Sequence, residues 1–258
     1  MNRAIIMIAI AMLLSAAALA QKQIKPWKEW NKKDAEKILN DSAWSHSQTE
    51  SNSSQSSDVP SNFGDTRGRE DSQRNVPTNS SLTFHVRFFT ARPVRQAYVR
   101  MLELSDNAPD SSAMEKMEAW ANLAAADRII VTVAYEGDQR IVGRIAPTFR
   151  AAKVEDLKES VYLERNDGKR VQVAEYTPPA KDVFGARFTF PRTVNGQPFL
   201  TPDATTIRFH AEYEPKVLDA AVVTSRQANA SRSSDTYKLK LDLKFKVAEM
   251  IYNGDLEY

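Results

Sequence analysis

The stretch Tyr237–Val247, YKLKLDLKFKV, has the clearest periodicity of the chain. Every second residue in it is apolar, and the residues between them are lysines except for Asp242. Because successive side chains of a strand point to opposite faces, this alternation predicts a strand with one dry and one wet face. Such a strand belongs to an antiparallel sheet that covers a core with one side only.

Further strands are predicted by alternation, by β-branched residues and by turn sequences. Asn166-Asp167-Gly168 is a typical hairpin turn, and so is Asn253-Gly254 near the end of the chain. Prolines from Pro178 to Pro215 limit the length of the strands around them. The additional strands that we expect are 82–89, 128–136, 161–165, 169–175, 186–190 and 206–213, with a polar loop at 225–235.

Helices are predicted mainly between the first two of these strands. Pro93 suits the first turn of a helix, whose apolar stripe consists of Val94, Ala97, Tyr98, Met101 and Leu102. A second helix is expected at 112–125 and a short one at 152–160. This order predicts an α+β fold, with a mostly antiparallel sheet, two to three helices packed on one face, and a short tethered helix before it.

The tethered helix is predicted from Lys25–Trp44, KPWKEWNKKDAEKILNDSAW, which contains three of the four tryptophans. Asn31 and Asp34 have the spacing of a capping box, and Trp30 and Ala35 have that of a hydrophobic staple. A helix of about ten residues is marginal alone in water, so the tryptophans are expected to dock on another surface.

Two main surfaces are open to this helix. The first is the folded domain of the same chain, which would bury the indoles. The second is a partner, such as an envelope protein, whose groove would accept the helix as an amphipathic peptide. A lipid interface is a weaker third alternative. The candidate partner-binding residues are Trp27, Trp30, Ile38, Leu39 and Trp44.

The chain is expected to have four parts. Residues 1–20 resemble a cleavable signal peptide, with a basic residue, an apolar run and a small-x-small site. Residues 21–45 are the tryptophan-rich segment, and 46–80 are a Ser/Asn-rich linker that is too polar to order itself. Residues 81–258 form one α+β domain. We therefore expect a periplasmic or secreted protein with no transmembrane span after cleavage.

Composition excludes several kinds of chemistry. The absence of cysteine excludes disulfides, thiolate nucleophiles and zinc–thiolate sites. A net charge of +2 favours no charged partner, and nucleic acid is not expected. No G-x-S-x-G, S-x-x-K or H-E-x-x-H motif is present, and the 8 glycines form no phosphate-binding loop. No catalytic residue and no cofactor can be assigned from motifs.

Histidines offer one alternative. His85 and His210 both occupy the polar side of a predicted strand, near Arg87, Arg208 and Glu212. If these strands were neighbours, the side chains would form a cluster able to bind an anion, to hold a metal ion or to catalyse hydrolysis. If they are not, the residues belong to solvated faces.

Basic residues offer two further anion sites. Arg92 and Arg95 flank Pro93 at a helix N-terminus, where the backbone N–H groups and the helix dipole favour anions. The lysines of 238–246 could attract an acidic polymer, or they could keep an edge strand soluble.

Three short segments are similar to a family of exported bacterial proteins with no assigned activity. They are Pro26-Trp27-x-x-Trp30 through Trp44, Phe88–Arg95 and Met250–Gly254. The resemblance implies export and a shared architecture, and it implies no catalytic residue; the serine-rich tract departs from it. The expected function is a non-enzymatic protein-interaction module of the envelope or the extracellular space. The alternative is an exported hydrolase or anion-binding enzyme that uses His85, His210 and Glu212.

Overall fold

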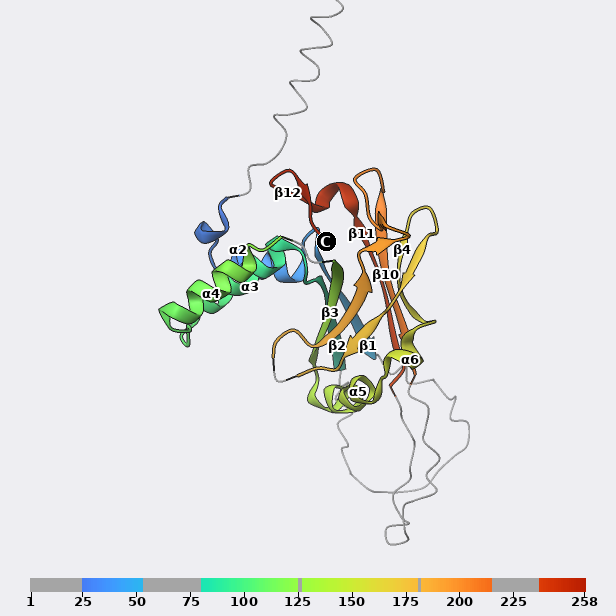
Figure 1. Cartoon of the computed structure of the whole chain (residues 1–258). Helices are drawn as coiled ribbons and strands as arrows, with labels where there is room; N and C mark the ends of the chain where they lie inside the picture. The colour runs from blue at the N-terminus through green and yellow to red at the C-terminus, as the bar shows by residue number, and fades with distance from the viewer. Residues whose placement is uncertain (1–24, 53–79, 125–126, 181, 215–236) are drawn as a thin grey trace, which may run out of the picture.

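The computed structural model describes residues 25–52, 80–124, 127–180, 182–214 and 237–258 (Figure 1). The predicted signal peptide, residues 53–79 of the predicted linker and the loop predicted at 225–235 lie outside these ranges. Every helix in the described part of the chain is too short or too polar to cross a membrane.

Two antiparallel sheets face each other, with the orders β1-β2-β3-β7-β6 and β11-β10-β4-β5. The first contains β1 (Ser45–Asn52), β2 (Ser80–Phe88), β3 (Arg128–Gly137), β7 (Ala186–Pro191) and β6 (Glu175–Thr177). The second contains β11 (Leu239–Lys246), β10 (Thr206–Tyr213), β4 (Val161–Arg165) and β5 (Arg170–Gln172). The α+β class is confirmed.

The remaining elements lie at the ends and on one side of the sheets (Figure 1). The helices are η2 (Trp27–Glu29), α2 (Lys32–Asn40), α3 (Arg92–Glu103), α4 (Ser111–Ala121), α5 (Gln139–Ala151), α6 (Val154–Leu157) and η3 (Val247–Met250). Two small hairpins pair β8 (Thr193–Val194) with β9 (Gln197–Pro198) and β12 (Ile251–Tyr252) with β13 (Asp255–Leu256).

The core lies between the inner faces of the two sheets. The Phe88 ring packs edge-on against Phe245, with centroids 4.9 Å apart, and Phe188 packs on Phe209 at 5.7 Å. These contacts join β2 to β11 and β7 to β10. Along β11, buried and exposed residues alternate without exception, which confirms the period-2 prediction for this stretch.

The edges of the sheets are also connected. The side-chain amide of Gln48 on β1 donates to the carbonyl of Lys240 (2.8 Å) and accepts from the N–H of Asp242 (3.2 Å), both on β11. At the opposite edge the chain passes directly from β5 to β6. There Val173 bonds to β4 and Ala174 bonds to β7 through their backbone N–H groups. The two sheets therefore resemble a flattened barrel.

One sequence expectation is wrong, and one helix was not predicted. Residues 46–52 were assigned to the disordered linker, whereas they form β1 and pair with β2 along its length. The backbone ladder of β2 orders this polar strand, and composition does not reveal such pairing. Helix α5 was missed because Gly143 and Pro147 look like helix breakers, although both are exposed and the helix buries Ile145 and Phe149.

The tryptophan segment docks on its own domain. Trp30 and Trp44 are each only 3% exposed. Trp30 packs with Ala35 of α2 and with Ala97 of α3. Arg100 of α3 donates to the carbonyl of Trp30 at 2.7 Å. The capping box between Asn31 and Asp34 is present as predicted. A domain boundary at residue 45 is therefore absent, because α2 and β1 are packed as parts of one unit.

The end of the described chain covers Trp44. Its indole N–H donates to the Glu257 carbonyl at 2.9 Å, and its ring packs edge-on against Tyr252 with centroids 6.0 Å apart. The hairpin that brings these residues back turns at Asn253 and Gly254, which both have positive φ, as the sequence predicts. Residues more than two hundred positions apart thus close one end of the core.

Replacing Trp44 by Ala should lower the free energy of unfolding by about 3–5 kcal/mol, because a large core side chain and its hydrogen bond are lost together. Urea denaturation followed by circular dichroism measures this loss. The matched control is Trp27→Ala, since Trp27 is half-exposed and should cost much less. Equal losses in the two variants would contradict the docked position of Trp44.

Candidate functional site

The cluster predicted from His85 and His210 does not form. His85 is on β2 of the first sheet and His210 is on β10 of the second, each on the outer face, so the core lies between them. The prediction of a shared catalytic, anion or metal site with Glu212 is therefore wrong. Alternation placed both histidines on polar faces correctly, but it could not show that their strands belong to different sheets.

Charges on the outer face of the second sheet neutralise one another. Arg208 forms a two-pronged ion pair with Asp242, and hydrogen bonding to this guanidinium lowers the pKa of Asp242. Glu212 is 2.8 Å from the ammonium of Lys238. His210 lies beside the Asp242 carboxylate, with its Nδ1 3.8 Å from the nearer carboxylate oxygen. Lys246 is likewise 2.8 Å from Glu249. Two lysines of the predicted anion-attracting face, Lys238 and Lys246, are thus paired with carboxylates of the chain.

The anion site predicted at Arg92 is occupied by the chain itself. The carboxylate of Glu257 accepts the backbone N–H of Arg92 at 2.9 Å, at the start of α3, and also pairs with the Arg92 guanidinium. Burial by itself lowers the pKa of the Arg92 guanidinium, but the hydrogen bonds to Asp255 and Glu257 outweigh burial, so the pKa is raised. The sequence identified the anion preference of this helix end, but the anion is an internal carboxylate.

Arg95 is also not an open site. Its side chain is buried and donates to the carbonyls of Trp120 (3.0 Å) and Leu123 (2.6 Å) at the end of α4. A cation there satisfies carbonyls that have no partner within the helix. The role of Arg95 is to fix α4 against α3, so the prediction that it binds an external anion is wrong.

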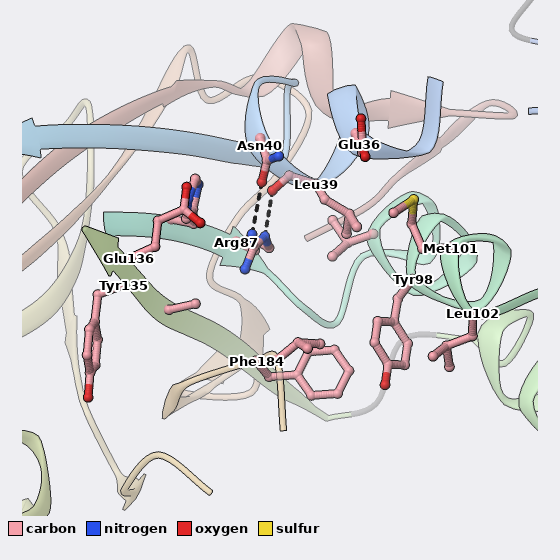
Figure 2. Close-up of a pocket in the computed structure, with 14 residues that line it drawn as sticks. Glu36, Leu39, Asn40, Arg87, Tyr98, Met101, Leu102, Tyr135, Glu136 and Phe184 are labelled. Atoms are coloured by element: carbon pink, nitrogen blue, oxygen red, sulfur yellow. Dashed lines mark hydrogen bonds and ion pairs between the residues drawn. The ribbon is translucent and has the colours of Figure 1, made fainter. Parts of the chain in front are cut away.

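A cleft of about 460 Å³ lies where α2 and α3 extend over the outer face of β2 and β3 (Figure 2). The segment that precedes β7 forms its remaining wall. The lining residues are Glu36, Leu39, Asn40, His85, Arg87, Val94, Tyr98, Met101, Leu102, Ala134, Tyr135, Glu136, Val183 and Phe184. Most of them are apolar, with a few polar groups, which is the usual composition of a ligand pocket.

One end of the cleft is apolar and aromatic. The Tyr98 and Phe184 rings have centroids 4.3 Å apart, and Met101 and Leu102 lie beside them (Figure 2). Burial raises the pKa of Tyr98, so its hydroxyl stays neutral at physiological pH. The segment that carries Phe184 lies directly against β3 at Gly185, where any Cβ would collide with the backbone of β3.

The other end of the cleft contains Arg87. Its Nε donates to the Leu39 carbonyl at 2.5 Å and one Nη donates to the Asn40 side chain at 3.0 Å, at the end of α2. Burial lowers the pKa of Arg87 to about 10, although Glu136 acts in the opposite direction. Among the described residues no carboxylate lies within ion-pair distance of it. Its cross-strand neighbours Ser45 and Thr132 have buried hydroxyls without a hydrogen-bond partner.

A row of polar groups borders this end. Ser47 Oγ is 2.8 Å from His85 Nδ1, and His85 Nε2 is 3.1 Å from Glu136 on the next strand. The order serine–histidine–carboxylate is that of a catalytic triad. However, Ser47 Oγ also donates to the Asn40 carbonyl at 3.0 Å, and the Glu136 side chain is 74% exposed. Neither feature favours an activated nucleophile.

Comparisons of the chain with protein-family models, curated proteins and solved structures gave no match. Of the predicted partner-binding residues, Leu39 lines the cleft, whereas Trp30 and Trp44 are buried elsewhere. No sequence pattern indicated Phe184 as a site residue, and Tyr98 was assigned to the apolar stripe of a helix although its side chain is only half-buried.

Replacing Glu257 by Gln should lower the free energy of unfolding by about 2 kcal/mol, because a buried charged acceptor at the start of α3 is lost. Thermal or urea denaturation measures the change. Asp255→Asn is the matched control, since Asp255 contacts the same arginine but its side chain is 68% exposed and should contribute less than about 1 kcal/mol. Similar effects of both substitutions would contradict the internal capping role of Glu257.

Proposed function

We propose that this protein is an exported, non-enzymatic binding protein whose recognition site is the cleft between the α2–α3 pair and the first sheet. The cleft volume supports this proposal, since about 460 Å³ is within the range of small-molecule sites, about 300–1,000 Å³. Export is proposed from residues 1–20 and from the family resemblance.

The docked helix changes where a ligand would bind. Trp30 and Trp44 have their apolar surface covered by the chain itself, so a partner would have to release α2 before it could contact them. Release would also break the hydrogen bonds from Arg87 and Arg100 to this segment. The cleft needs no such opening. We therefore assign recognition to the cleft and structural support to the tryptophans.

A second candidate function is hydrolysis by the Ser47–His85–Glu136 row. The hydrogen-bonded order of these groups favours it. The Ser47 hydroxyl donates to the Asn40 carbonyl and the Glu136 side chain is 74% exposed, and both features argue against an activated nucleophile. Binding without chemistry is thus the function that the geometry supports better.

Replacing Ala134 by Trp should weaken binding in the cleft, since Ala134 forms part of its wall and the indole would fill much of the space. Titration with the neutral dye Nile red tests this prediction. The wild type should bind the dye in its native state, and Ala134→Trp should weaken binding at least about tenfold through loss of apolar contact. Ala119→Trp, on the exposed side of α4, is the control and should bind as the wild type does.

Undiminished dye binding by folded Ala134→Trp would show that the cleft is not the site. Circular dichroism and thermal melts establish that both variants are folded before the titrations are compared.

The hydrolase alternative predicts that a fluorophosphonate probe labels Ser47. We expect no labelling, because the hydroxyl proton is directed to the Asn40 carbonyl. Mass spectrometry of the treated wild type, compared with Ser47→Ala and with Ser105→Ala as a control serine, tests this. Labelling that disappears only in Ser47→Ala would establish the second function in place of the first.

A further inference from the structure

Arg87 is a cation whose hydrogen-bonding capacity is only partly used. A guanidinium has five N–H donors, and two of those of Arg87 are bonded, to Leu39 and Asn40. The remaining donors have no partner among the described residues, and Arg87 contributes to the lining of the cleft. They are not among the buried atoms without a partner, so they reach the open space of the cleft, where a ligand acceptor can replace water.

The end of α2 does not by itself neutralise this charge. A helix C-terminus carries about half of a negative charge, and it contacts only one side of the guanidinium. Glu136 is close enough to act on Arg87 electrostatically, but it is hydrogen-bonded to His85 and largely exposed, where water screens its charge. A ligand that brings one full negative charge next to Arg87 would neutralise the remaining charge of the guanidinium.

Resting on the function proposed above, we propose that the ligand of the cleft is a monocarboxylic acid with an apolar body. Its carboxylate pairs with Arg87, and its body lies along Tyr98, Met101 and Phe184. A carboxylate accepts two parallel hydrogen bonds from a guanidinium, which suits the free donors of Arg87. A phosphate dianion suits the cleft less, because Glu36 and Glu136 also line it and would repel a second negative charge.

The shape of the cleft agrees with this orientation. Figure 2 shows Arg87, Asn40 and Glu136 at one side and Tyr98, Leu102 and Phe184 at the other. Met101 can adjust to different apolar shapes because its side chain is unbranched and flexible. Val183, 67% exposed, is part of the lining and allows a longer body to emerge. Fatty acids and aryl-alkanoic acids share this chemistry, and the experiment separates them.

The test is calorimetric titration of the wild-type protein with decanoate, decanol, decylamine and 4-phenylbutyrate, each below its aggregation concentration. Decanoate should bind about ten- to a hundredfold more tightly than decanol, which corresponds to a charge-assisted hydrogen bond. Comparison of decanoate with 4-phenylbutyrate distinguishes an extended from an aromatic body. In Arg87→Met the preference for the acid over the alcohol should disappear, whereas Arg128→Met, on the same sheet but exposed, should retain it.

Because Arg87 also supports α2, Arg87→Lys provides a second variant that keeps a cation, and it should retain a reduced preference for the acid. Decanol binding as tightly as decanoate in the wild type would overturn the carboxylate assignment while leaving a binding cleft. If decylamine bound most tightly of the four, the carboxylate assignment would be overturned, and Glu36 and Glu136 would be the groups that recognise a cationic ligand. No binding of any of the four compounds, together with no binding of Nile red, would overturn both the assignment and the proposed function.

Discussion

The structure depends on the burial of Trp44 between segments from opposite ends of the described chain. Its indole N–H bonds to the Glu257 carbonyl, and its ring contacts Tyr252. The same Glu257 uses its carboxylate to cap α3. One residue pair therefore fixes the end of the first sheet, the C-terminal hairpin and the helix that forms a wall of the cleft. Because a buried indole requires a partner for its N–H, this arrangement specifies one register and not only close packing.

The cleft is a consequence of that docking. Helix α2 is placed over β2 by the packing of Trp30 on α3 and by the bonds from Arg87 to the end of α2. Leu39 and Asn40 come from the docked segment and Arg87 comes from the sheet, so neither part has a site alone. A ligand that contacts both parts would stabilise the docked state, since binding to the native state alone shifts the folding equilibrium.

Sequence patterns could predict the elements whose cause is local. The alternation of β11, the turn at Asn253-Gly254 and the capping box at Asn31 are set by neighbouring residues, and all three are present. Strand β1 could not be predicted, because its order comes from the ladder to β2. The site was harder to predict than the fold. His85 was identified as a candidate, but its neighbours in the structure, Ser47 and Glu136, are on other strands, and no local sequence pattern shows which strands are adjacent.

The difference between the two outer faces is what distinguishes the site from an ordinary polar surface. On the second sheet, Arg208 and Lys238 have carboxylate partners within the chain, so their charges are used in folding. On the first sheet, Arg87 is more deeply placed, its pKa is lowered by burial, and its partners are neutral. The end of α2 accounts for part of this charge, since a helix C-terminus favours a cation, but it contacts only one side of the guanidinium. Retaining the charge there is understandable if an external anion completes the site.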